Sequence, residues 1–140
     1  METIVAGYTL GFVLAVSGWA IERIARAGKS GALSRNAIAG IRTPATMASD
    51  EAWKAAHRVA AGPTAAGAII CLASGVAAMF IATLSSVEAI PDALADPVLL
   101  ATVIFSSIAL LGLGGYGCFV GNRAPKAETK RRTSELTTES

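Results

Sequence analysis

Three long stretches of this chain contain no charged side chain. They cover residues 4–21, 62–84 and 97–121. Each has enough apolar residues to cross a hydrocarbon core of about 30 Å, which takes roughly 20 residues of helix. A buried helix of a soluble protein rarely runs this far without a charge. The pattern therefore predicts an all-α integral membrane protein with three transmembrane helices.

The composition of the chain favours the same class. Of its 140 residues, 53% are hydrophobic and only 16% are charged, against about 25% charged in an average soluble domain. The mean hydropathy is +0.54. A signal peptide would begin with basic residues, but Glu2 is the only charged side chain before the first stretch. We therefore expect the first stretch to be a retained membrane helix.

The basic residues are distributed unevenly between the segments outside the spans. All 12 Lys and Arg residues lie in residues 22–61 or 122–140, and none lies in residues 85–96. Segments rich in Lys and Arg stay on the cytoplasmic side of a membrane. The pattern predicts a cytoplasmic loop 22–61, an external loop 85–96, an external N-terminus and a cytoplasmic C-terminus. The net charge of +2 gives no indication of nucleic-acid binding.

The last 19 residues differ from the rest in composition. Residues 122–140 are polar and charged and lack an apolar period, which is typical of disorder. We expect one three-helix membrane domain, residues 1–121, followed by a disordered cytoplasmic tail. The basic cluster Lys130–Arg132 either contacts anionic lipid or serves only to fix the topology.

Inside the spans the notable residues are small or weakly polar. Glycines recur four residues apart, as at Gly7 and Gly11, and such spacing lets helices of one chain pack closely or builds an oligomer interface. Cys71 and Cys118 fall at different depths, so we expect two buried, unpaired thiols. No ionisable side chain lies at mid-membrane, which argues against an ion pump or proton relay within the bilayer.

The first loop contains local signals for a turn and for a helix start. Pro44 biases the residue before it toward extended backbone, so the segment 41–44, IRTP, is predicted to be extended. Ser49 precedes two acidic residues, which suits a helix N-cap followed by a first turn that complements the helix dipole. Trp53 and His57 are four residues apart and share one helix face.

These signals predict a short amphipathic helix over about residues 50–60. We expect it to lie at the inner membrane surface with Trp53 directed inward. Asp50 and Lys54 are four residues apart and are expected to pair on another face. Gly62 and Pro63 are expected to turn the chain from this helix into the second span.

Ten residues of the first loop and the first residue of the second span form a run with many fixed spacings. They are Asn36, Gly40, Ile41, Arg42, Thr43, Thr46, Ser49, Trp53, His57, Arg58 and Gly62. This run resembles the signature of the SdpI family of bacterial multi-pass membrane proteins, and residues 1–121 resemble the three-helix half of that family. The resemblance implies a location in the bacterial inner membrane. It also implies a link to the founding member, which gives immunity to a secreted toxic peptide and signals to a repressor.

The chemistry of the candidate residues favours structure or recognition over a reaction. Arg42 is suited to a lipid phosphate, to a carboxylate of a partner or of the same loop, or to backbone carbonyls. His57 is open to a role as ligand, base or pH sensor, or as a hydrogen-bonded packing residue. Ser49 and His57 are eight residues apart, and no nucleophile, base and orienting group are apparent. Asn36 is expected to cap a turn.

We therefore predict a non-enzymatic inner-membrane protein without cofactor or metal. Its ordered cytoplasmic loop would mediate recognition, sensing or immunity to membrane-active peptides. Its predicted partners are the lipid bilayer and an unidentified membrane or cytoplasmic protein. The first alternative is an accessory subunit of a larger membrane complex. The second is a membrane enzyme or metal-dependent transporter that uses Arg42, Asp50 and His57.

Overall fold

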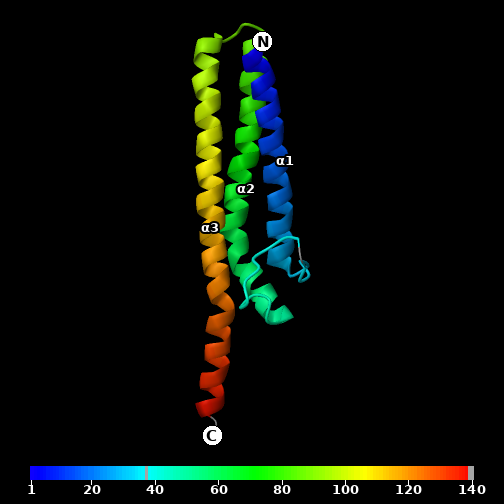
Figure 1. Cartoon of the computed structure of the whole chain (residues 1–140), viewed down its shortest axis with the longest axis vertical. Helices are drawn as coiled ribbons and strands as arrows, with labels where there is room; N and C mark the ends of the chain where they lie inside the picture. The colour runs from blue at the N-terminus through cyan, green and yellow to red at the C-terminus, as the bar shows by residue number, and fades with distance from the viewer. Residues whose placement is uncertain (37, 139–140) are drawn as a thin grey trace.

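The chain folds into three long helices and no other regular element within the described residues, which are 1–36 and 38–138 (Figure 1). This is a computed structural model, and it describes side chains as far as Lys126. The helices are α1 (Glu2–Ser30), α2 (Asp50–Ser86) and α3 (Asp92–Thr138). Each contains a window long and apolar enough to cross a membrane. The predicted all-α class with three spans is confirmed.

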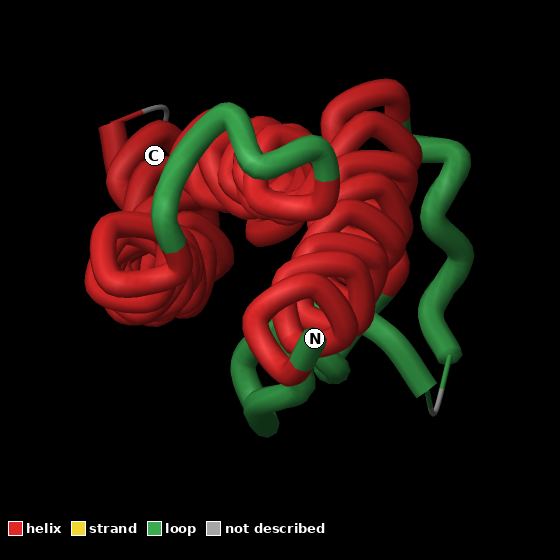
Figure 2. Tube along the Cα trace, turned by 90° about the horizontal axis from the view of Figure 1, so that it is seen from above, coloured by secondary structure: helices red, strands yellow, loops and turns green. Residues whose placement is uncertain are grey.

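Helix α2 lies between the other two helices. It packs extensively against both α1 and α3, while α1 and α3 make few contacts with each other (Figure 2). Glycines bring the backbones of α1 and α2 together. A Cβ added at Gly18 would lie 2.5 Å from the Leu72 nitrogen, and one added at Gly75 would lie 2.5 Å from the Ala15 nitrogen. These glycines therefore pack helices of the same chain.

Helix α1 extends well beyond the predicted end of the first span. It ends at Ser30 and is capped by Gly31, whose φ of 78° is a left-handed conformation that glycine adopts without strain. The segment between α1 and α2 is therefore residues 31–49, shorter than the predicted loop 22–61, and we call it the connection. At the other end of the molecule, the predicted loop 85–96 shortens to residues 87–91.

The predicted separate helix over residues 50–60 is not present. The helix begins at Asp50 as predicted, and the Ser49 hydroxyl accepts a hydrogen bond from the Ala52 amide at 3.1 Å. It then continues through Gly62 and Pro63 into the second span. Proline removes one backbone hydrogen bond and bends a helix, and the alanines on both sides favour its continuation. In Figure 1 the first turns of α2 lie at an angle to the rest of that helix.

Two further expectations differ from the structure near the end of α3. The tail was expected to be disordered from residue 122, but the backbone is helical as far as Thr138. The tail is rich in Ala, Lys, Glu and Arg, which have high helix propensity and suit such an extension. Cys118 was expected to be buried, but it is exposed, whereas Cys71 is buried.

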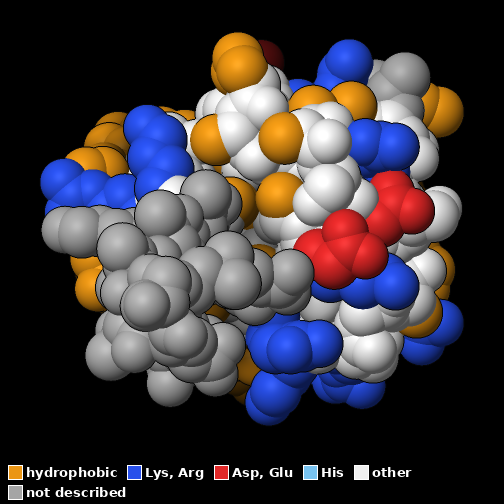
Figure 3. All heavy atoms as spheres, turned by 90° about the horizontal axis from the view of Figure 1, so that it is seen from below, with side chains coloured by type: hydrophobic (Ala, Val, Ile, Leu, Met, Phe, Trp, Pro, Cys, Tyr) orange, Lys and Arg blue, Asp and Glu red, His pale blue; other side chains and the backbone are white. Residues whose placement is uncertain are grey.

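The two ends of the bundle differ in charge. The connection and the C-terminal part of α3 lie at one end, and the N-terminus and the 87–91 loop lie at the other (Figure 1). Lys and Arg side chains are spread over the connection end (Figure 3). Residues 22–61 and 122–126 hold nine basic and three acidic residues. The other end, residues 1–3 and 85–96, holds acidic side chains and no Lys or Arg.

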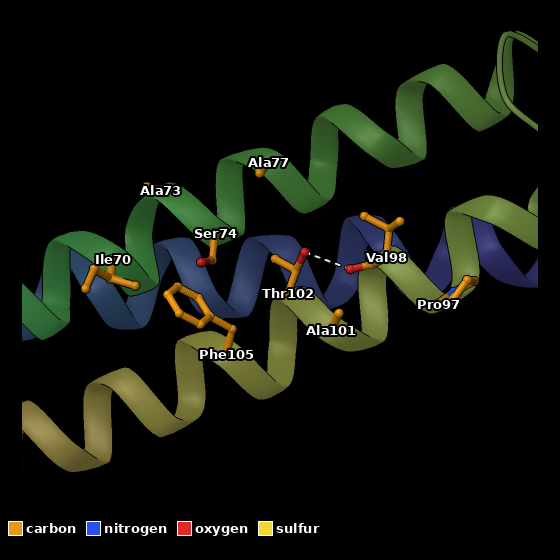
Figure 4. A pocket seen from close by; sticks show the side chains of 9 residues that line it. All are labelled: Ile70, Ala73, Ser74, Ala77, Pro97, Val98, Ala101, Thr102 and Phe105. Atoms are coloured by element: carbon orange, nitrogen blue, oxygen red, sulfur yellow. Dashed lines mark hydrogen bonds between the residues drawn. The ribbon is translucent and has the colours of Figure 1, made fainter.

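A shallow apolar groove of about 730 Å³ runs between α2 and α3, in the half of the bundle away from the connection. Figure 4 shows the Phe105 ring and small side chains such as Ala73 and Ala101 along it. The Thr102 hydroxyl donates to the Val98 carbonyl at 2.8 Å, so its polar group is satisfied within α3. The groove therefore presents a mostly apolar surface to its surroundings.

Candidate functional site

The connection folds back over the first turns of α2, and His57 lies at the centre of the contact. The Ile41 amide donates to His57 Nε2 at 2.8 Å, and His57 Nδ1 lies 2.8 Å from the Trp53 carbonyl oxygen. An amide only donates and a carbonyl only accepts. Nε2 must therefore be unprotonated and Nδ1 must carry the proton. Both ring nitrogens are used to hold backbone, which leaves neither of them for a metal or a substrate proton.

Gly40 makes this contact possible. Its φ is 110°, a conformation that L side chains rarely adopt. A Cβ at this position would overlap His57 Nε2 and lie 3.0 Å from the Trp53 ring. Glycine is therefore required at residue 40 both for the backbone conformation and for the approach to the imidazole. Gly40 is one of the residues of the predicted signature, and this contact gives a physical reason for glycine at that position.

Trp53 supports His57 from the same helix face. Its side chain is 1% exposed, and its ring centroid lies 4.1 Å from that of the imidazole. The indole Nε1 donates to the Leu33 carbonyl at 2.8 Å. This bond satisfies the only polar atom of the indole and fixes the start of the connection to α2. The predicted shared face of Trp53 and His57 is confirmed, and it is directed into the protein.

Two threonines shape the segment after Ile41. The Thr46 side chain is fully buried, and its hydroxyl donates to the Ile41 carbonyl at 2.6 Å and accepts from the Thr43 amide at 2.9 Å. The Thr43 hydroxyl donates to Asn122 Oδ1 at 2.6 Å. The connection is thereby bonded to α3 as well as to α2. Residues 41–43 have no regular structure and a turn begins at Pro44, as the sequence indicated.

The start and end of the connection are held by further local bonds. Asn36 Oδ1 accepts from the amides of Ile38 and Ala39 at 2.8 and 2.9 Å, which is the predicted turn-capping role. Arg35 donates from Nη1 to the Met47 carbonyl at 2.8 Å, and its Nε lies 3.2 Å from Asp50 Oδ1. Asp50 therefore pairs with Arg35, where the sequence suggested Lys54.

The structure separates the remaining predicted residues from this buried cluster. Arg42 and Arg58 are both exposed, Arg42 on the connection and Arg58 on α2. Asp50 is engaged by Arg35, and both nitrogens of His57 are engaged by backbone. Among the side chains that the structure describes, no group of three His, Cys, Asp or Glu residues could hold a metal.

Sequence reasoning missed several residues that complete the site. Asn122 lies 79 residues from Thr43, and a polar residue just after a span carries no signal of this contact. Leu33 contributes only a backbone carbonyl. Gly28 is the point where α1 meets His57, since an added Cβ would lie 3.2 Å from His57 Cβ.

A cavity of about 220 Å³ lies behind the connection, where the three helices converge. Ala25 of α1, His57 and Ala61 of α2, and Gly114 and Cys118 of α3 contribute to its lining, which is predominantly apolar. Ile41 also lines the cavity, and it packs so closely on Gly121 of α3 that an added Cβ there would lie 2.5 Å from the Ile41 Cδ1.

The fold and the site define a class: a membrane protein of three spans whose connection between the first two helices is fixed to the bundle by side chains. The SdpI/YfhL protein family matches this chain over residues 32–121, which include the connection, α2 and most of the apolar part of α3. The chain therefore belongs to the SdpI/YfhL family, as the resemblance indicated. Searches of curated proteins and of solved structures found no match.

Proposed function

We propose that this protein is a non-enzymatic bacterial inner-membrane protein whose connection is a cytoplasmic recognition surface, with immunity to membrane-active peptides as its role. The observation that supports this most strongly is that polar side chains of the signature form hydrogen bonds to backbone. His57, Trp53 and Thr46 all bond to backbone of the connection or of α2. Groups used in this way stabilise a surface of fixed shape, whereas a catalyst needs groups free to bind and transfer.

The charge of the connection end supports the proposed orientation. Nine basic residues lie at that end within the described side chains, and the opposite end has no Lys or Arg. The positive-inside tendency places such an end in the cytoplasm. In this orientation the exposed Arg42 and Arg58 side chains face the cytoplasm or the inner lipid surface. Their planar guanidinium groups suit carboxylates and phosphates of a partner.

Survival of a deletion strain exposed to a membrane-active peptide tests the proposal. Complementation with the wild-type chain should restore resistance, and the double variant Arg42→Gln/Arg58→Gln should not. The matched control is Arg23→Gln/Arg123→Gln, which removes two exposed charges at the same end but outside the signature. Membrane levels of all chains are compared by blotting. A deletion strain with unchanged sensitivity, or equal loss of resistance in both double variants, contradicts the proposal.

A second candidate function is that of an accessory subunit in a larger membrane complex. The groove between α2 and α3 favours it, because its apolar lining and small side chains suit a transmembrane helix of a partner subunit (Figure 4). Extraction in a mild detergent followed by affinity purification tests this candidate. A stable partner that is lost in an Ala101→Phe variant, which fills the groove, supports it. A wild-type protein that migrates alone excludes it.

A further inference from the structure

The cavity behind the connection is not part of the proposed recognition surface. It lies where the inner ends of α1, α2 and α3 meet, and it has a volume of about 220 Å³. We propose that it holds part of one acyl chain of an anionic phospholipid, whose headgroup lies on the basic end of the molecule. This is a lipid-binding site in addition to the proposed recognition surface, and it does not depend on that function.

The lining of the cavity favours an apolar occupant over water. A buried water needs two or more polar partners, and an apolar cavity of about 150 Å³ stays dry and takes up benzene. Here the imidazole of His57 is the largest polar group in the lining, and both of its nitrogens are already bonded to backbone. Apart from Thr64 and Cys118, the rest of the lining is alanine, glycine and isoleucine. A flexible hydrocarbon chain suits this surface.

The arrangement of the helices gives a lipid chain a way in from the bilayer. The cavity is lined by both α1 and α3, yet these two helices make few contacts with each other (Figure 2). The connection covers the cavity from the end of the bundle, through Gly40 and Ile41. A ligand therefore reaches the cavity between α1 and α3, from the lipid side, where acyl chains are the surrounding solvent.

Charge around the cavity favours an anionic headgroup. Lys29 is four residues after the cavity residue Ala25, so it lies one helical turn further along the same face of α1. Lys54 precedes the cavity residue Ala61 by seven positions, two turns along the same face of α2. Both lysines are exposed. An anionic phosphate at this end is attracted by the excess of basic residues, and a neutral or zwitterionic headgroup gains less.

Two glycines of α3 provide a matched pair of variants. Gly114 lines the cavity, and a Cβ added there meets nothing within 4 Å, so Gly114→Leu should fill the cavity without a clash. Gly112 is equally open, but it is exposed on the outer face of α3 and does not line the cavity. Gly112→Leu therefore adds the same side chain to the same helix outside the proposed site. Far-UV circular dichroism checks that both variants keep their helix content.

Native mass spectrometry of the full chain, purified in a mild detergent with equal amounts of phosphatidylglycerol and phosphatidylcholine, tests the proposal. Wild type and Gly112→Leu should each retain one phosphatidylglycerol, and Gly114→Leu should lose it. Equal retention by Gly114→Leu and wild type overturns the site. Retention of both lipids in equal proportion overturns the preference for an anionic headgroup. Failure to retain any lipid overturns the proposal.

The thiol of Cys118 gives a second measurement, because it lines the cavity and is exposed. Phosphatidylglycerol should slow its alkylation by N-ethylmaleimide several-fold in wild type and in Gly112→Leu, as measured by peptide mapping. In Gly114→Leu the leucine side chain fills the cavity, so alkylation of Cys118 should be slow without lipid. Adding phosphatidylglycerol should not change that rate. A wild-type rate that does not respond to phosphatidylglycerol contradicts occupancy of the cavity by its acyl chain.

Discussion

The contact between Gly40 and His57 makes a quantitative prediction about two glycines. Gly40 and Gly31 both have a positive φ, at 110° and 78°. Replacing Gly31 with alanine imposes left-handed backbone strain of about 1–2 kcal/mol, and the strain at the less populated conformation of Gly40 is at least as large. At Gly31 an added Cβ meets nothing within 4 Å, so strain is the whole cost. At Gly40 the added Cβ overlaps His57 Nε2 and must displace the imidazole or the connection.

The extra cost at Gly40 has two parts. Forcing a methyl group into a packed site costs about 1–3 kcal/mol. Displacing the imidazole also removes the hydrogen bond from the Ile41 amide, which contributes about 1 kcal/mol. Gly40→Ala should therefore open the connection more readily than Gly31→Ala by at least about 2 kcal/mol, which is roughly 30-fold in the opening equilibrium. The gain from a stiffer unfolded chain is the same for both variants and cancels.

Amide hydrogen exchange of the protein in lipid nanodiscs measures this difference directly. The Ile41 amide is bonded to His57 Nε2, so its exchange reports opening of the connection. Its protection should be at least about 30-fold lower in Gly40→Ala than in Gly31→Ala, following from the energy difference above. Equal protection of the Ile41 amide in both variants would refute the argument, as would unchanged protection in Gly40→Ala.

Two further predictions concern the ends of the same site. The Thr43 hydroxyl donates to Asn122 Oδ1 at 2.6 Å. A double-mutant cycle with Thr43→Val and Asn122→Ala should therefore give a coupling free energy of about 0.5–1.5 kcal/mol in SDS-induced unfolding. A coupling free energy of zero means that the connection is not bonded to α3. The Ser49 hydroxyl caps α2, so Ser49→Ala should lower the unfolding free energy by about 1 kcal/mol, while Ser49→Asp should not. An unchanged unfolding free energy in Ser49→Ala shows that the cap does not stabilise α2.

Local rules account for the features that the sequence predicted well. The three spans follow from stretches without charge. The helix start at Asp50 follows from Ser49, whose hydroxyl accepts the predicted N-cap bond. The buried face with Trp53 and His57 follows from their spacing of four residues. Each of these depends on neighbours within about one or two helical turns, which a single sequence contains.

The features that the sequence did not predict depend on contacts between distant segments. The Gly62-Pro63 pair was expected to end a short helix, but α2 continues because packing and alanine-rich flanks outweigh the lost hydrogen bond. The partner of Thr43 is 79 residues away, and no spacing rule connects it to Asn122. The protonation state of His57 became evident only when the structure placed a donor on one nitrogen and an acceptor on the other.

The central claim is that His57 holds the connection in place as a neutral hydrogen-bonded residue and is not a ligand or a catalytic base. The chain has a single histidine, so ¹⁵N NMR of histidine-labelled protein in nanodiscs observes this ring alone. We expect a protonated Nδ1 and an unprotonated Nε2 that is coupled through its hydrogen bond to the Ile41 amide. A protonated Nε2, or rapid exchange between the two neutral tautomers, would contradict it.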